Sequence, residues 1–176
     1  MKKVVVISSS LRNGSNSEIM AKEFAKGASL NNEVAFISLK DFEMKFCLGC
    51  LACQSQEKCI LKDDVHMYLK DISNADVLVF ATPIYYYGMS GQLKTFLDRL
   101  NPLYVRKNRF KEVYLLASCA DDNPCAIDKT IVSLNGWIEC FEGVNFKKSL
   151  LATSTTEAKS LSEEMKIKAF NLGKEI

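Results

Sequence analysis

The chain has 176 residues, a formal net charge of +2, 48% apolar residues and 25% charged residues. This length accommodates a single domain with its own hydrophobic core, and we expect residues 1–176 to form one. The weak net charge gives no electrostatic reason to expect binding to nucleic acid or to an anionic membrane. No apolar stretch approaches a membrane span, and the first apolar run is too short for a signal peptide, so we expect a cytoplasmic protein.

The first predicted strand consists of four consecutive apolar residues, Val4–Ile7. A strand of this kind is buried on both faces, as in a parallel sheet. A polar loop follows at Ser8–Ser17, and the first helix begins near Asn16. The backbone N–H groups at a helix N-terminus have no partner within the helix and favour anions. The stretch therefore predicts a phosphate site, with a well-capped helix start that binds nothing as the alternative.

The same loop indicates which phosphate it would bind. It has neither the G-x-x-x-x-G-K-[ST] pattern of P-loops nor the G-x-G-x-x-G dinucleotide fingerprint. Ser10, Ser15 and Ser17 supply hydroxyl donors, and Arg12 supplies a charged, forked donor. A hydroxyl-rich loop at this place in an α/β chain fits the monophosphate of flavin mononucleotide (FMN).

Predicted helices and strands alternate along the rest of the chain. We expect a helix over residues 16–28, a strand over 33–39 and an irregular stretch over 44–62 that holds four of the seven cysteines. A helix capped by Asp63 or Asp64 follows this stretch.

A buried strand is predicted at 76–81, followed by the loop Thr82–Gly91 and a helix that ends before Pro102. A fourth strand is predicted at 113–117, with a helix after it that starts at Pro124. The pattern ends with a fifth strand at 149–153 and a helix whose apolar side carries Ala158, Leu161, Met165, Ala169 and Leu172.

Five strands that alternate with helices predict a doubly wound parallel sheet in a three-layer α/β/α arrangement. Ligands of such sheets bind at the carboxyl ends of the strands, where the strand order reverses. Three polar or aromatic loops are expected there, namely Ser8–Ser17, Thr82–Gly91 and Ser118–Asn123. Their agreement supports the phosphate site.

Three adjacent tyrosines, Tyr85 to Tyr87, lie between Pro83 and Gly88 in the second loop. Their rings could flank a flat isoalloxazine, while backbone groups of this loop could bond its pyrimidine edge. The alternative is that they pack against helices or a second subunit. Because three adjacent rings cannot all face one flavin, we expect both uses.

Three segments resemble known flavoproteins. Ser9–Ser15 is similar to the GS-x-R-x-x-S phosphate loop of NAD(P)H-dependent FMN reductases, and Thr82–Arg99 resembles their T/S-P-x-Y…S-G-x-L-K-x-F-x-D-R segment. The spacing Cys47-x₂-Cys50-x₂-Cys53-x₅-Cys59 is similar to that of the iron–sulfur flavoprotein branch of this superfamily. The resemblance covers most of residues 1–100.

This resemblance implies a flavodoxin-like fold with strand order 2-1-3-4-5, bound FMN, and a homodimer or homotetramer. The residues that would hold the phosphate are Ser10, Arg12, Ser15, Asn16 and Ser17. Those that would hold the ring are Pro83, Ile84, Tyr85, Tyr86, Tyr87 and Gly88, with Ser118 from the third loop. The chain departs from the family pattern at Ser8 and Ser9, which replace a glycine, and at Ser118–Asp122, which lacks the usual glycines.

The four cysteines of the 44–62 stretch are candidate metal ligands: Cys47, Cys50, Cys53 and Cys59. Spacers of two residues let a turning backbone bring sulfurs onto one centre, as iron–sulfur clusters and zinc require. The family branch implies a [4Fe–4S] cluster, and zinc or four metal-free thiols are the alternatives.

The resemblance also implies an activity. NAD(P)H would reduce the flavin by hydride transfer, and electrons would pass to a quinone-like, flavin or protein acceptor, through the cluster if one is present. Because the cofactor carries the chemistry, we predict no catalytic acid or base. The alternatives are an iron–sulfur flavoprotein electron carrier without its own small-molecule substrate, and a redox sensor based on thiols or a metal.

Overall fold

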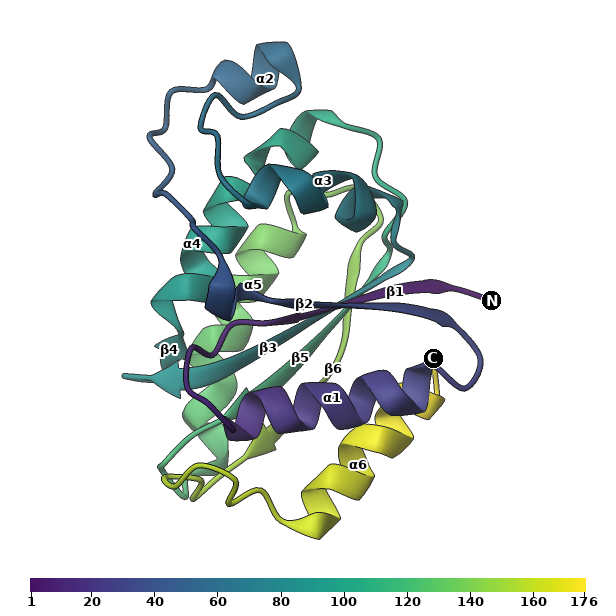
Figure 1. The fold of residues 1–176 in the computed structure, drawn as a ribbon, viewed down its shortest axis with the longest axis vertical. Coiled ribbons are helices and arrows are strands. Elements are labelled where there is room, and N and C mark those ends of the chain that lie inside the picture. Colours follow the sequence, from purple (N-terminus) through teal and green to yellow (C-terminus); the bar gives the residue numbers. More distant parts are fainter.

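The computed structural model describes residues 1–176 and contains one twisted sheet with helices on both faces (Figure 1). Its five parallel strands lie in the order β2-β1-β3-β5-β6, which is 2-1-3-4-5 when they are numbered along the chain, so the predicted fold class is confirmed. Their bounds are β1 Lys3–Ser8, β2 Glu33–Ser38, β3 Val77–Tyr85, β5 Glu112–Ser118 and β6 Asn145–Ala152. A two-residue strand, β4 (Gly88–Met89), pairs antiparallel with the end of β3.

The helices form the two outer layers (Figure 1). One face of the sheet is covered by α1 (Asn16–Ala28) and α6 (Glu163–Lys174), and the other by α3 (Val65–Asn74), α4 (Gly91–Arg99) and α5 (Asp128–Ile138). Short 3-10 turns lie at Leu39–Asp41, Asn101–Val105 and Pro124–Ile127, and the short helix α2 (Ala52–Gln56) projects beyond α3 at one end of the molecule. None of the helices has both the length and the apolar character needed to cross a membrane.

A hydrophobic core lies on each face of the sheet, and the apolar run of β1 contributes side chains to both, as expected for a strand that is buried on two faces. Val5 and Ile7 pack in the core under α3, α4 and α5, whereas Val4 and Val6 pack in the core under α1 and α6. All four side chains are at most 3% exposed. Because successive side chains of a strand point to opposite faces, this alternation fixes the register of β1 between its neighbours.

Several predicted boundaries were wrong, among them the start of α5, which begins at Asp128 after a 3-10 turn at Pro124–Ile127. Strand β3 continues to Tyr85 rather than ending at 81, because it pairs with β5 as far as Pro83 and then with β4. Strand β6 begins at Asn145 rather than 149, since its polar first residues lie at the sheet edge and pair with β5. The last helix begins only after Ser162, whose hydroxyl accepts the Met165 N–H, so Ala158 and Leu161 precede it.

Two glycines bring α1 and α6 into direct backbone contact. A Cβ atom on Gly27 would lie 2.0 Å from the Phe170 carbonyl oxygen, and one on Gly173 would lie 2.1 Å from the Phe24 carbonyl oxygen. No side chain can be accommodated at either position without moving a helix. Since α1 starts at the polar loop after β1, this contact also fixes where that loop lies.

Candidate functional site

A hollow of about 160 Å³ lies where parallel strands of the sheet end, and we call it the strand-end hollow. Three loops, which follow β1, β5 and β6, contribute to it together with the end of β3. Its lining residues are Ser10, Arg12, Ser15, Asn16, Pro83, Ile84, Tyr85, Ser118, Cys119, Ala120, Thr155 and Thr156. The three loops that the sequence placed at one edge of the sheet therefore do meet.

Eight of the twelve residues predicted to bind FMN line this hollow: Ser10, Arg12, Ser15, Asn16, Pro83, Ile84, Tyr85 and Ser118. The other four do not line it. Ser17 is fully buried in the first turn of α1, and Gly88 forms the start of β4. Tyr86 is fully exposed, and Tyr87 points its hydroxyl to a neighbouring loop.

Ser15 is the residue that begins α1. Its backbone is extended, and its hydroxyl oxygen accepts the Glu18 N–H at 3.1 Å, which makes it the N-cap. The hydroxyl also lies 3.3 Å from that of Ser17. Because the cap uses the oxygen of Ser15, its proton remains free to be donated to Ser17 or to a ligand. The preceding Gly14 has a φ of +65°, which allows the chain to turn sharply into the helix.

The Arg12 guanidinium, also from the loop after β1, reaches the loop after β6. It donates to the Thr156 carbonyl oxygen at 2.7 Å and approaches the Glu157 carboxylate at 4.0 Å. The side chain is half exposed, and three of its five N–H groups are available beyond these two partners. It therefore places a positive charge beside the free N–H groups of α1, an arrangement that attracts an anion.

The Asn16 side chain is engaged by other parts of the chain. Its side-chain amide donates to the Glu157 carbonyl oxygen at 2.8 Å and to the Ser160 hydroxyl at 3.1 Å, and its oxygen accepts the Leu161 N–H at 3.0 Å. The amide is thus occupied in holding the segment after β6 against the first loop. This leaves the side chain little capacity to bind a ligand directly.

Sequence reasoning missed Thr155 and Thr156, which bring the loop after β6 to the hollow. The signal was present, because polar residues follow the fifth predicted strand as they follow the first and fourth. The Thr155 hydroxyl donates to the Cys119 carbonyl oxygen at 2.9 Å, so this loop is fastened to the loop after β5.

Tyr86 and Tyr87 form the two-residue turn between β3 and β4, with φ values of 50° and 63°. The Tyr87 hydroxyl donates to the Asp121 carboxylate at 2.7 Å. This hydrogen bond raises the pKa of the Tyr87 phenol and lowers the pKa of the Asp121 carboxyl. It also fastens the turn to the loop after β5, so two sides of the strand-end hollow are held together.

Cys119 is the one cysteine that lines the strand-end hollow. Burial raises the pKa of its thiol, and the Sγ atom lies 3.2 Å from the Asp121 carbonyl oxygen. A thiol with a raised pKa stays protonated near neutral pH and is a poor nucleophile. Cys119 is therefore suited to contact a ligand as a neutral side chain.

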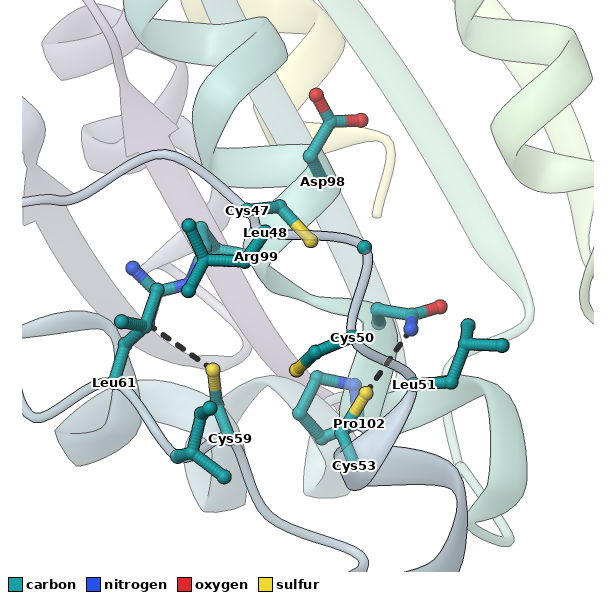
Figure 2. Close-up of a pocket in the computed structure, with 13 residues that line it drawn as sticks. Cys47, Leu48, Cys50, Leu51, Cys53, Cys59, Leu61, Asp98, Arg99 and Pro102 are labelled. Carbon is teal, nitrogen blue, oxygen red and sulfur yellow. Dashed lines mark hydrogen bonds between the residues drawn. The ribbon is translucent and has the colours of Figure 1, made fainter.

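A second, separate hollow is lined by Cys47, Cys50, Cys53 and Cys59, and we call it the cysteine hollow (Figure 2). It shares no lining residue with the strand-end hollow. Its walls also include neighbours of these cysteines and, from the end of α4 and the turn after it, Asp98, Arg99, Asn101 and Pro102. The four thiols surround one space, but no three of the chain's cysteine, histidine and acidic side chains converge closely enough to hold a metal ion.

Two of these thiols accept hydrogen bonds from residues near the end of α4 (Figure 2). The Asn101 amide donates to Cys53 Sγ at 3.0 Å, and the Arg99 guanidinium donates to Cys59 Sγ at 3.5 Å. Cys47 and Cys50 are exposed and make no such contact. Cys53 and Cys59 are thus fixed to the body of the protein.

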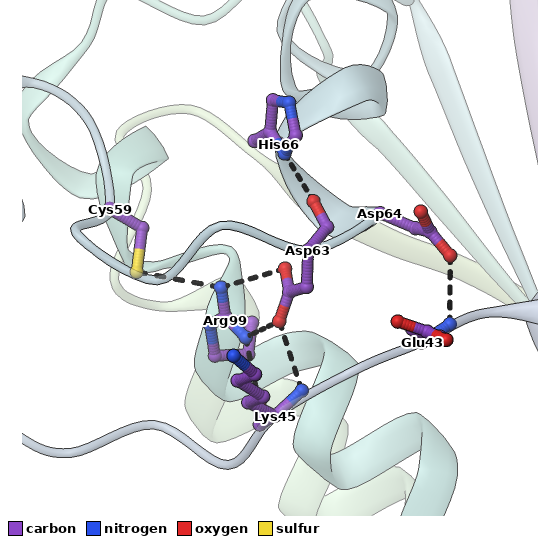
Figure 3. A network of polar contacts seen from close by, with 7 residues as sticks. All are labelled: Glu43, Lys45, Cys59, Asp63, Asp64, His66 and Arg99. Carbon is purple, nitrogen blue, oxygen red and sulfur yellow. Dashed lines mark hydrogen bonds and ion pairs between the residues drawn. The ribbon is translucent and has the colours of Figure 1, made fainter.

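Arg99 forms a buried ion pair with Asp63, and both side chains are at most 2% exposed (Figure 3). Burial alone would raise the pKa of the Asp63 carboxyl, but hydrogen bonds from Arg99 and from the Lys45 N–H outweigh it and lower that pKa. Burial likewise opposes the charge on Arg99, and the bond to Asp63 outweighs it and raises the pKa of the guanidinium. Both groups are charged near neutral pH.

The chain matches the profile of the NADPH-dependent FMN reductase family over residues 2–123. It is 38% identical over 104 residues to an iron–sulfur flavoprotein of Methanocaldococcus jannaschii, covering 58% of this chain and 54% of that protein. It is 30% identical over 142 residues to an iron–sulfur flavoprotein of Methanosarcina thermophila, covering 77% and 72%. The chain spans about half the length of the first of these relatives.

Solved structures show the same fold. An NAD(P)H:quinone oxidoreductase from Methanothermobacter marburgensis superposes with a TM-score of 0.75 at 17% identity, covering 98% of this chain and 94% of that one. At this identity the likeness concerns the arrangement of the sheet and its helices.

Proposed function

The chain belongs to the NADPH-dependent FMN reductase family, and on that premise we propose that it is an FMN-binding oxidoreductase that takes electrons from NAD(P)H. The observation that carries this proposal is the strand-end hollow. Loops from distant parts of the chain meet there and bring together hydroxyls, a guanidinium, a helix N-terminus and aromatic or apolar walls. That set of groups is what a phosphate joined to a flat ring requires.

The hydrogen-bonding capacity of the first loop supports FMN as the ligand. The Ser15 hydroxyl proton is free beyond the cap. Arg12 keeps N–H groups beyond those that it uses on the chain. The loop therefore offers more donors than the protein itself satisfies, as expected for a site that binds an oxyanion.

Each wall of the hollow has a distinct role in this proposal. Ser10, Ser15 and Arg12 would bind the phosphate, together with the first N–H groups of α1. Pro83, Ile84 and Tyr85 would border one side of the ring, with Ser118 and Cys119 on the other. Bound FMN would supply the chemistry, since it accepts a hydride from a nicotinamide and returns electrons to an acceptor. The chain binds and orients it, and no acid or base is required.

We propose a [4Fe–4S] cluster as the occupant of the cysteine hollow. Four thiols around one space match the ligand set of such a cluster, and the relatives described above carry the name iron–sulfur flavoprotein. The sulfurs would draw closer than they stand here, which exposed Cys47 and Cys50 are free to do. The cluster would pass single electrons between the flavin and an external acceptor, either a small molecule or a protein.

We further propose that the chain assembles as a homodimer or homotetramer. Tyr85 is 55% exposed and Tyr86 is fully exposed at the strand-end edge. Large exposed aromatic side chains beside a ligand site favour contact with a second subunit.

Arg12→Met is expected to weaken FMN binding by about 10- to 100-fold, because it removes a charged hydrogen bond worth about 1.5–3 kcal/mol. Its thermal stability should stay close to that of the wild type, since the side chain is half exposed. The measurement is a fluorescence titration of the flavin-free protein with FMN.

The matched control is Arg109→Met. Arg109 is similarly exposed and also pairs with an acidic side chain, Asp76, but lies outside the strand-end hollow. This variant should bind FMN as the wild type does. Equal losses in both variants, or no loss in Arg12→Met, would contradict the proposed phosphate site.

A steady-state assay distinguishes an enzyme from an electron carrier. We expect the FMN-loaded protein to oxidise NAD(P)H repeatedly when a quinone or ferricyanide is present as acceptor. A protein that binds FMN yet shows no turnover with any of these pairs would instead support the carrier function.

A further inference from the structure

The fourth cysteine of the hollow is not placed by local turn geometry. Cys47, Cys50 and Cys53 follow one another at intervals of three residues. Cys59 comes six residues after Cys53, beyond the end of α2 and beyond Glu57, whose φ of 54° reverses the chain. A residue elsewhere in the fold must therefore determine where its sulfur lies.

That residue is Arg99, which reaches the cysteine stretch from the last turn of α4 (Figure 3). Its guanidinium donates to Cys59 Sγ at 3.5 Å and to the Lys45 carbonyl oxygen at 2.7 Å, and it makes a two-pronged contact with Asp63. One side chain thus contacts the chain before Cys47, the sulfur of Cys59 and the residue that follows the stretch.

The two ends of the cysteine stretch are also joined to each other. The Asp63 carboxylate accepts the Lys45 N–H at 2.9 Å, and the Asp64 carboxylate accepts the Glu43 N–H at 2.7 Å (Figure 3). The Asp64 N–H donates in turn to the Glu43 carbonyl oxygen at 3.2 Å. Arg99 contacts both of these joined ends, at Lys45 and Asp63, and therefore helps to fix where the cysteine stretch lies.

Burying an arginine here is costly. The side chain is 1% exposed, and its Nε atom has no hydrogen-bond partner. Two apolar side chains in place of a buried ion pair are often as stabilising or more so. What an apolar pair could not supply is a charged N–H donor held rigidly against a sulfur.

We propose that Arg99 is the positioning residue that presents Cys59 as the fourth thiolate ligand of the cysteine hollow, with Asp63 holding the guanidinium in place. This inference rests on the proposed metal-binding function of that hollow. Cys47 and Cys50 are exposed and can close on a metal by local movement. Cys53 is held by Asn101, and Cys59 is held by Arg99 of α4.

The test uses Co²⁺ added to the metal-free full-length protein without oxygen, because thiolate–cobalt charge-transfer absorption increases with the number of sulfur ligands. Arg99→Met/Asp63→Asn removes the ion pair without leaving a lone buried charge, and asparagine still accepts the Lys45 N–H. We expect this double variant to lose about a quarter of the absorption per bound cobalt, as Cys59→Ser should. Adding Cys59→Ser to the double variant should cause no further loss.

Arg106→Met is the matched control, since Arg106 donates to the Glu57 carbonyl oxygen in the same stretch but contacts no sulfur. It should keep the wild-type cobalt spectrum. Arg99→Lys is a second test should the double variant fail to fold. It retains a partner for Asp63 but lacks the fork that reaches Lys45, Asp63 and Cys59 together, so the Cys59 contribution should still be lost.

The outcomes separate the two proposals. A wild-type chain that gives no thiolate–cobalt absorption would overturn the metal-binding function and, with it, the role of Arg99. Wild-type absorption that persists undiminished in a folded Arg99 variant would overturn the positioning role alone. A loss in the Arg99 variant that adds to the loss from Cys59→Ser would also overturn it, because the two changes would then act on different ligands.

Discussion

Arg99→Met is expected to lower the free energy of unfolding by about 3–5 kcal/mol, which is the cost of leaving one member of a buried ion pair without its partner. The Asp63 side chain is only 2% exposed, so its carboxylate would lose its charged partner, and would either stay charged at a cost or have to take up a proton, in a region that water does not reach. Urea denaturation at neutral pH, followed by circular dichroism, measures this loss.

The double variant Arg99→Met/Asp63→Asn is the control for this prediction. Because it removes both charges, it should recover most of the stability that the single variant loses. If the single and double variants were equally unstable, packing around Arg99 rather than the unpaired carboxylate would be responsible, and the interpretation of the ion pair would be wrong.

The same pair has a predictable pH dependence in the wild type. The folded-state pKa of Asp63 lies below its ordinary value of 3.8, so the contribution of the carboxylate to stability is fully present above that pH. It is lost as the pH falls from 3.8 through the lower folded-state value. We expect the stability difference between the wild type and the double variant to shrink over that acidic range.

Gly27→Ala is expected to destabilise the protein by about 3 kcal/mol, the upper end of the usual cost of overpacking. The new Cβ would lie 2.0 Å from the Phe170 carbonyl oxygen, and a backbone atom cannot rotate away as a side chain can. Helices α1 and α6 would have to separate. Thermal and urea denaturation measure the effect.

Gly136→Ala is the matched control, because Gly136 also lies within a helix, α5, and a Cβ added there would have no atom within 4 Å apart from its chain neighbours and the backbone of its own helix. It should stabilise the protein by about 0.5–1 kcal/mol, since alanine loses less backbone freedom on folding than glycine. A loss of stability in both variants would contradict this account. An added Cβ would then destabilise the protein even where it meets no other helix, so the loss in Gly27→Ala could not be assigned to the α1–α6 contact.

The parts of the fold that follow from local patterns could be predicted from the sequence. The bounds of α1 match the expected residues 16–28, because Ser15 caps the helix and its apolar residues recur at helical spacing. The central strands were found from apolar runs, which only burial on both faces explains. The start of β6 could not be found in this way, because Asn145 and its polar neighbours become a strand only by pairing with β5.

The candidate sites show the same division. The loops of the strand-end hollow could be placed because parallel topology puts every strand end at one edge of the sheet. The hydrogen bonds of the Asn16 side chain to the segment after β6 could not be predicted, because its partners lie 141 to 145 residues away along the chain. The contact of Arg99 with Asp63 and Cys59 also joins residues 36 and 40 positions apart, whereas the sequence shows Arg99 only as the last residue of the segment that resembles the FMN reductases.

The measurement that tests the central claim most directly is the absorbance spectrum of the protein purified without oxygen, with FMN, iron and zinc assayed per chain. We predict flavin bands above a broad iron–sulfur shoulder, with FMN approaching one per chain and iron present. Flavin bands without iron or zinc would keep the strand-end hollow as the FMN site and remove the cluster. A protein that shows no flavin bands, even after FMN is added, would contradict the assignment of that hollow.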